Sequence, residues 1–236
     1  MLKIWVYLEA TPLLGLTITL AAYLLGLFLF QKGRRSPLLN PVLIAVILLI
    51  LLLRSTGTDY RTYFQGAQFV HFLLGPATVA LAIPLYRQLP ALKRSAAAIA
   101  AALLAGSLTA VASAMLVARF FGGSTQIVRS MAPKSVTSPI AMGISEQIGG
   151  LPSLTMAFVL ITGILGAALG LSLLDLLKIR DQRARGLALG VASHGIGTAR
   201  ALQESETAGA FSGLAMGLNG VVTSVIVPLI ASLPFF

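Results

Sequence analysis

The sequence contains no cysteine and few charged residues. The absence of cysteine among 236 residues excludes disulfides, thiol catalysis and cysteine metal sites. Only 10% of the residues are charged, against roughly 25% in soluble domains. So few charges cannot cover a water-exposed surface. We therefore expect an all-α integral membrane protein whose principal solvent is lipid.

Recognisable catalytic motifs are also missing from the sequence. It has no G-x-S-x-G, no phosphate-binding loop and no H-E-x-x-H. With only two histidines, a histidine-rich metal site is not available. We expect neither an enzyme nor a bound cofactor.

Long apolar runs account for most of the chain, of which 57% is hydrophobic. A bilayer core needs about 20 mostly apolar residues per helix. Six spans are predicted, over residues 8–30, 38–53, 68–86, 96–118, 153–177 and 208–233. The first run is longer than a signal-peptide core, so we expect it to be retained. Gly75-Pro76 and Pro84 predict a kink in the third span.

Basic residues give the chain a net charge of +10 and cluster between the predicted spans. Ten lie on one side, namely Lys32, Arg34, Arg35, Arg87, Lys93, Arg94, Lys178, Arg180, Arg183 and Arg185. Six lie on the other side, namely Lys3, Arg54, Arg61, Arg119, Arg129 and Lys134. Because cytoplasmic loops carry the excess of Lys and Arg, both termini are predicted outside. This placement favours a membrane protein over a nucleic-acid partner.

Two polar stretches interrupt the apolar pattern, over residues 131–150 and 186–205. Each combines hydroxyls with glycine or proline, and each precedes a glycine-rich span. We interpret them as re-entrant hairpins that enter from opposite faces, which together with the spans would form an inverted repeat. Surface loops that merely connect spans are the alternative. The whole chain, 1–236, is then one transmembrane domain, divided into a scaffold (1–118) and two hairpin–span pairs (131–177 and 186–236).

The hairpins supply candidate binding residues for a small carboxylate. Free donors at helix N-termini and one arginine would hold the anion. The candidates are Thr137, Ser138, His194, Gly195, Thr198, Arg200 and Asn219. Alternatively, Arg200 extends to the membrane surface and His194 is a packing residue. Glu146 and Glu204 could carry a proton, or could pair with Lys134 or Arg200 at the rims.

Three segments resemble the LrgB/CidB membrane-protein family. They are FLLGPATVALAIPLYRQ (72–88), PKSVTSPIAMGIS (133–145) and SHGIGTARALQES (193–205) followed by GAFSGLAMGLNG. The resemblance implies a bacterial inner-membrane protein, a small LrgA/CidA-type partner and a dimer or larger homo-oligomer. Bacterial members are described as holin-like or antiholin-like proteins that modulate murein hydrolase activity and autolysis. Plastid relatives move glycolate and glycerate, and some bacterial pairs are implicated in pyruvate movement.

Two functions remain open from the sequence. The first is a secondary transporter, or its transport subunit, for monocarboxylates of the pyruvate, glycolate or glycerate type. The second is a holin-like or antiholin-like regulator that acts by assembly in the membrane, for which the glycine-rich helix faces could provide the contacts.

Overall fold

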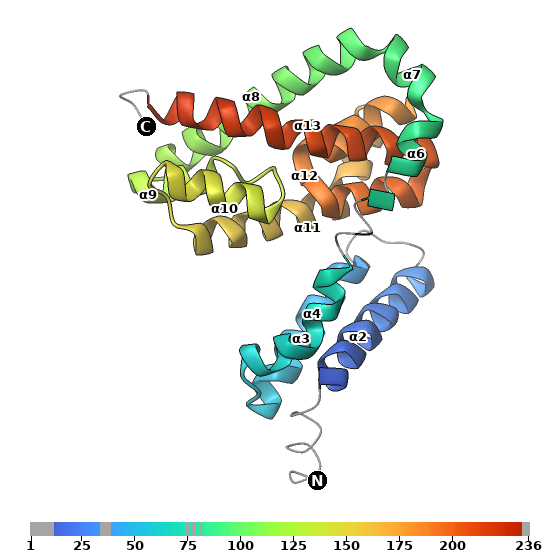
Figure 1. The fold of residues 1–236 in the computed structure, drawn as a ribbon, viewed down its shortest axis with the longest axis vertical. Coiled ribbons are helices and arrows are strands. Elements are labelled where there is room, and N and C mark those ends of the chain that lie inside the picture. The colour runs from blue at the N-terminus through green and yellow to red at the C-terminus, as the bar shows by residue number, and fades with distance from the viewer. Residues whose placement is uncertain (1–11, 34–38, 74–75, 77–78, 81, 233–236) are drawn as a thin grey trace. The chain divides into compact units, whose positions relative to one another are not determined.

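The computed structural model describes residues 12–33, 39–73, 76, 79–80 and 82–232, and this part of the chain contains helices and turns but no strand (Figure 1). The all-α prediction is confirmed. The chain forms two compact units, residues 1–80 and 81–236. The predicted division of the domain at residue 118 stays a prediction, although α8 (Ala96–Phe120) packs with later helices of the second unit.

The first unit contains α2 (Pro12–Lys32), α3 (Pro41–Thr56) and α4 (Tyr60–Phe72). The Asn40 side chain caps α3 by accepting hydrogen bonds from the next turn, and Gly57 ends the helix in the left-handed conformation with φ 71°. A Cβ at Gly15 would lie 2.5 Å from the Tyr63 carbonyl oxygen, so glycine allows α2 and α4 to touch.

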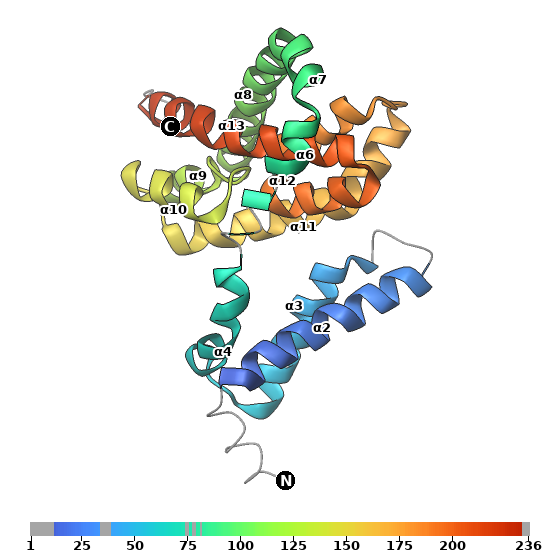
Figure 2. The ribbon, with the colours of Figure 1, turned by 45° about the vertical axis from the view of Figure 1, so that its right-hand side comes forward.

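The second unit contains eight helices in the part that the structure describes. They are α6 (Ala82–Arg87), α7 (Leu89–Arg94), α8 (Ala96–Phe120), α9 (Thr125–Met131), α10 (Ser138–Gln147), α11 (Pro152–Leu176), α12 (Gln182–Glu204) and α13 (Glu206–Ala231). Helix α12 lies between α11 and α13, and α8 packs against both α12 and α13 (Figures 1 and 2). Helix α12, the most polar of the long helices in this unit, is therefore also the one most enclosed by neighbouring helices.

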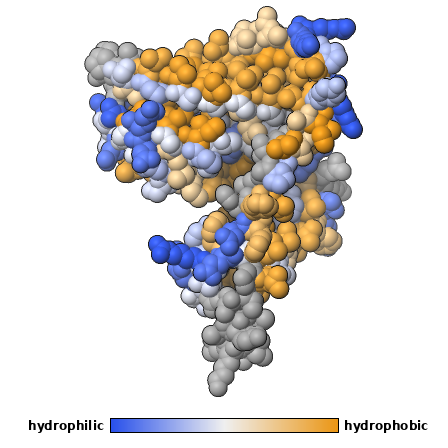
Figure 3. All heavy atoms as spheres, viewed as in Figure 1, coloured by the Kyte–Doolittle hydropathy of each residue, from blue (hydrophilic) through white to orange (hydrophobic). Residues whose placement is uncertain are grey.

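Four helices are long and apolar enough to cross a bilayer, namely α2, α8, α11 and α13. At 25 residues, α8 and α11 are each about 37 Å long, which exceeds the roughly 30 Å hydrocarbon core. Large apolar side chains such as Leu116, Leu165 and Leu229 are more than half exposed, as expected for a lipid-facing surface. Figure 3 shows this apolar surface over α13 and α8, with hydrophilic residues gathered toward both ends of these helices.

These four helices correspond to the predicted spans 8–30, 96–118, 153–177 and 208–233, apart from residues 8–11 and 233, which lie outside the described part of the chain. The other two predicted spans fit less well. Residues 38–53 correspond to α3, which at 16 residues falls below the usual length of a span. Within residues 68–86, α4 ends at Phe72 and α6 begins at Ala82, and residues 74–75, 77–78 and 81 between them lie outside the described part of the chain, so a single kinked span stays a prediction.

Candidate functional site: a cavity between two chain reversals

The first chain reversal is inside α12, where the helix breaks at Ser193 and His194. Ser193 has φ −134° and ψ 15°, and His194 has φ 43° and ψ −135°. The two halves, 182–192 and 195–204, return to a common base. There the Gln182 amide donates to Glu204 at 3.4 Å and accepts from the Ser205 hydroxyl at 3.1 Å. The predicted hairpin over 186–205 is thus a pair of antiparallel half-helices.

Hydrogen bonds and glycines hold the tip of this hairpin. The His194 Nε2 atom lies 3.0 Å from the Val159 carbonyl oxygen, which can only accept, so Nε2 carries the proton. The Thr198 hydroxyl donates to the His194 carbonyl at 2.9 Å. A Cβ at Gly163 or Gly166 of α11 would collide with the side chains of His194 and Ser193, respectively. The glycine face of α11 therefore packs internally against the hairpin.

The second chain reversal separates α9 from α10. The chain leaves α9 near Ser130, turns through residues 132–137 and returns along α10 to Gly150. The Ser130 hydroxyl accepts from the Leu151 amide at 2.8 Å, and Thr155 donates to the Ser130 carbonyl at 2.9 Å. Ser145 lies 2.7 Å from the same Thr155 hydroxyl. These bonds close the base of the reversal and leave its turn to face the rest of the unit.

Asn219 connects the two reversals. Its Nδ2 donates to the carbonyl of Val191, just before the α12 break, at 3.0 Å, and to the carbonyl of Ser135, in the other turn, at 3.4 Å. Its Oδ1 accepts from Ser107 of α8 at 2.5 Å and from Thr223 at 3.3 Å. The side chain is buried and all its hydrogen-bonding positions are used by protein atoms. Asn219 is therefore a structural link between the reversals and α8.

A cavity of about 630 Å³, open to the surface along its side, lies beside this link, between α8 and the first half of α12. Its walls are mostly small residues, namely Ala102, Ala105, Gly106, Thr109 and Ala110 of α8 and Ala184, Leu187, Ala188, Val191 and Ala192 of α12. Lys134 and Ser135, from the turn before α10, complete its lining. We call this space the Lys134 cavity.

Lys134 is the one cationic residue of this lining. Its Nζ atom lies 3.4 Å from the Ser135 hydroxyl, and no carboxylate of the described residues lies within 4 Å of it. An ammonium group without a counterion is costly among apolar walls and favours an anionic ligand. Sequence reasoning counted Lys134 among the outside basic residues and placed it in the predicted hairpin over 131–150 without a binding role, and the available signal was its position between Pro133 and Ser135 in a hydroxyl-rich turn.

The base of the α12 hairpin is held by ionic contacts. Arg185 is buried and lies 2.7 Å from Asp175 and 2.6 Å from Glu204, and it donates to the Ile179 carbonyl at 2.9 Å. These contacts join the end of α11 to both halves of the hairpin. Nearby, hydrogen bonding from Arg183 lowers the pKa of the Asp181 carboxyl to about 2, so Asp181 stays ionised where it caps α12.

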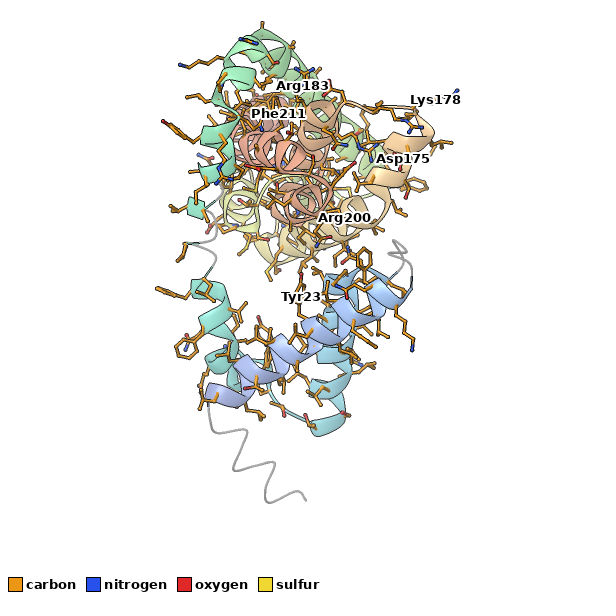
Figure 4. The ribbon with its side chains drawn as sticks, turned by 90° about the vertical axis from the view of Figure 1, so that its right-hand side faces the viewer. Tyr23, Asp175, Lys178, Arg183, Arg200 and Phe211 are labelled. Carbon is orange, nitrogen blue, oxygen red and sulfur yellow. The ribbon has the colours of Figure 1, made fainter. Side chains whose placement is uncertain are left out.

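The structure places the predicted site residues in different surroundings. His194, Thr198 and Asn219 are buried and bonded to protein atoms, whereas Thr137 and Ser138 stand at the start of α10. Gly195 begins the returning half of the hairpin. Arg200 donates to Gln203 at 3.2 Å and is not part of the Lys134 cavity lining. Figure 4 shows Arg183 and Phe211 on one side of the unit and Arg200 on the other.

The two predicted proton carriers have different surroundings. Glu146 is exposed near the end of α10, whereas Glu204 is mostly buried and pairs with Arg185 and not with Lys134 or Arg200. Their roles in proton coupling, like the binding roles of the other candidates, stay predictions. Among the described residues, no three His, Asp or Glu side chains gather in a way that could hold a metal ion.

Four helices long and apolar enough to cross a bilayer, with large apolar side chains exposed on them, define a multi-pass α-helical membrane protein. The family model described as LrgB-like matches residues 19–233. The chain is 36% identical over 219 residues to proteins named antiholin-like protein LrgB from Bacillus mycoides (strain KBAB4) and Bacillus cereus (strain B4264), an alignment that covers 93% of this chain and 95% of each relative. The chain therefore belongs to the LrgB-like family, which confirms the resemblance found in the sequence. No solved structure matches it.

Proposed function

We propose that this protein is a secondary transporter, or the transport subunit of one, for small monocarboxylates of the pyruvate, glycolate or glycerate type. The observation that carries the proposal is the Lys134 cavity. It has small apolar walls and one ammonium group, which pairs with no carboxylate of the described residues. It lies beside the two chain reversals that Asn219 joins by hydrogen bonds. One positive charge suits one carboxylate. Ser135 and Thr109 supply hydroxyls for a keto or hydroxyl group beside it.

In this proposal both reversals are re-entrant elements of an inverted repeat. Polar, non-helical backbone at membrane depth is tolerated where protein encloses it or where it lines a wet cavity. Transporters place their substrate where such interruptions meet. The protein lies in the bacterial inner membrane, and the face that carries Arg87, Lys178 and Arg180 is cytoplasmic under the positive-inside rule. Both termini are then outside, and no covalent chemistry is required.

Uptake into proteoliposomes tests the role of Lys134. Replacing Lys134 by Gln removes the charge and leaves a side chain of similar reach. Because a hydrogen bond to a charged group contributes about 1.5–3 kcal/mol, we expect a 10- to 150-fold loss of uptake at low substrate concentration. Lys93→Gln is the matched control, because Lys93 is exposed and does not line the cavity. Equal uptake by the Lys134→Gln and Lys93→Gln proteins would refute the assignment.

An antiholin-like regulator of autolysis is the second candidate, and the names of its relatives favour it. Such a regulator would act through assembly, with a small LrgA/CidA-type partner or with copies of itself. Gly163 and Gly166 are occupied by the α12 hairpin, so these glycines do not offer the assembly surface. Release of unrelated dyes from vesicles would support this candidate, whereas saturable uptake of one substrate class supports the transporter.

A further inference from the structure

The loop between α8 and α9 presents two phenylalanines to the surface. Phe120 is 85% exposed and Phe121 is 81% exposed, the highest values among the large apolar side chains of the described residues. Their rings meet edge to face, with centroids 5.5 Å apart. Two aromatic rings left in water forfeit the free energy of their burial, so the pair indicates a surface that apolar material covers.

The backbone of this loop holds the two rings in place. The Gly123 amide donates to the Ala118 carbonyl at 2.9 Å, and Gly122 adopts φ 77°, a conformation that favours glycine. The Ser124 side chain then caps α9 by accepting a backbone hydrogen bond. The loop is a short, defined turn, so the position of the rings follows from where α8 ends.

Arg119 adds a positive charge to the same surface. It is exposed in the last turn of α8, and no carboxylate of the described residues lies within 4 Å of it. Aromatic rings beside a cation, at the end of a long apolar helix, are typical of the headgroup region of a bilayer. Phosphate is the anion of that region, so its charge complements Arg119.

The polar contacts of the two chain reversals mark the middle of three long apolar helices. Ser107, Gly163 and Asn219 each lie within one residue of the midpoint of α8, α11 and α13, respectively. Ser107 bonds to Asn219, and Gly163 packs against His194 at the tip of the α12 hairpin. Because an apolar helix that crosses a bilayer is centred on the hydrocarbon core, these contacts lie near the bilayer midplane.

The distance from this level to the loop matches the headgroup region. Phe120 follows Leu108, the midpoint of α8, by about 18 Å at the rise of an α-helix. The hydrocarbon core extends about 15 Å from the midplane, and the headgroup region ends at about 20–22 Å. A helix tilt of about 20° reduces the 18 Å only to about 17 Å. Phe120 and Phe121 therefore lie at the depth at which aromatic side chains gather.

We propose that the α8–α9 loop, residues 119–124, is a lipid anchor. Phe120 and Phe121 insert between the phospholipid headgroups of one leaflet, and Arg119 binds a lipid phosphate. In the orientation proposed above, this is the outer leaflet. The inference rests on α8 crossing the bilayer and not on what the Lys134 cavity binds.

The anchor also fixes the depth of the Lys134 cavity. The α8 residues that line this cavity run from Ala102 to Ala110 and include the level of Leu108. Holding the end of α8 in the headgroup region therefore keeps the cavity near the midplane, where transporters bind their substrates.

Single-tryptophan variants test the depth of the loop. Trp5, the only tryptophan of the chain, is replaced by Phe, and Phe120→Trp then keeps an aromatic ring in the loop. Leu108→Trp is the matched control, because Leu108 is exposed at the midpoint of the same helix. The proteins are placed in vesicles of phosphatidylethanolamine and phosphatidylglycerol with bromine either near the headgroup or deep in the acyl chain. Iodide is the aqueous quencher, with N-acetyltryptophanamide as the reference for a ring in water.

We expect shallow bromine to quench Phe120→Trp at least twofold more than deep bromine does, and the reverse order for Leu108→Trp. Iodide should quench Phe120→Trp less than half as strongly as the free reference. The anchor is overturned if iodide quenches Phe120→Trp like the free reference, or if deep bromine quenches it most. Absence of quenching by bromine and by iodide also overturns it, since protein, such as a second copy of the chain, would then cover the ring.

Arg119→Gln tests the phosphate contact in the Phe120→Trp protein. Energy transfer from this tryptophan to an anionic dansyl-labelled phospholipid reports the lipid next to the loop. Losing one arginine near the membrane surface should lower the apparent affinity for this lipid about fivefold. Arg119→Lys keeps the charge and should lower it less than about twofold. Equal transfer in the Arg119→Gln protein and its parent would overturn the phosphate contact.

None of these measurements depends on transport, so the two proposals can fail separately. If quenching places the loop among the headgroups but Lys134→Gln leaves uptake unchanged, the proposed function fails and the anchor stands. If Lys134→Gln abolishes uptake but Phe120→Trp is in water, the anchor fails and the carboxylate site stands.

Discussion

Replacing Asn219 by aspartate tests how the two chain reversals are held together. Aspartate keeps an acceptor for Ser107 but removes the Nδ2 donor that serves the carbonyls of Val191 and Ser135. Val191 lies in the last turn before the α12 break, where helical carbonyls lack an intrahelical partner. The substitution therefore leaves buried acceptors unpaired and places a carboxylate oxygen against them.

The expected loss follows from these two bonds. A buried acceptor left without a partner costs about 1–3 kcal/mol. The bond to Ser135 is long, at 3.4 Å, so it should contribute at the lower end. We expect Asn219→Asp to lower the free energy of unfolding by about 2–4 kcal/mol. Reversible unfolding in mixed micelles measures this difference.

Two controls separate the Nδ2 bonds from the rest of the Asn219 environment. Thr223→Ala removes only a 3.3 Å bond to Oδ1 and should cost less than about 1 kcal/mol. Ser107→Ala removes one donor to Oδ1, and its effect should fall well below that of Asn219→Asp. If Asn219→Asp is as stable as Thr223→Ala, the reasoning that Asn219 ties the reversals together is refuted.

Two further predictions concern the base of the α12 hairpin. Arg185→Gln should destabilise the protein by about 3–5 kcal/mol, because Glu204 loses its partner while it stays mostly buried. The control is Arg183→Gln, which changes an exposed side chain and should cost far less in the same unfolding assay. Equal losses of stability in the two variants would contradict the assignment. Asp181 has a folded-state pKa of about 2, below the unfolded value near 3.9, so its stabilising effect is complete above about pH 5 and is lost as pH falls through 2. The stability difference between wild type and Asp181→Asn should therefore shrink between about pH 5 and pH 2, and a difference that does not change with pH would show that the carboxylate charge is unimportant.

Much of the helical framework could be predicted from composition and apolar runs, because lipid imposes the same length requirement on every crossing helix. Four predicted spans agree with α2, α8, α11 and α13 within a few residues. The range 68–86 stays a prediction as a single span, because residues between α4 and α6 lie outside the described part of the chain.

The candidate site was harder to predict, because its residues meet only through tertiary packing. The glycine spacing of α11 indicated a close helix approach but not its partner, which is the tip formed by Ser193 and His194. Arg200 was predicted from its charge and its place in the 193–205 segment, and its binding role stays a prediction. Neither signal reveals that Arg200 bonds to Gln203 while Lys134 lines a cavity.

In the re-entrant arrangement that we propose, the folded-back form of α12 also determines the side of the membrane on which the next helix begins. Both ends of α12 meet at Gln182 and Glu204, so in that arrangement the segment reaches inward and comes back without a net crossing. Helix α13 consequently starts on the same face at which α11 finished. Lengthening or shortening the two arms equally would change the depth of the tip but not the compartment that receives the carboxyl end of the polypeptide.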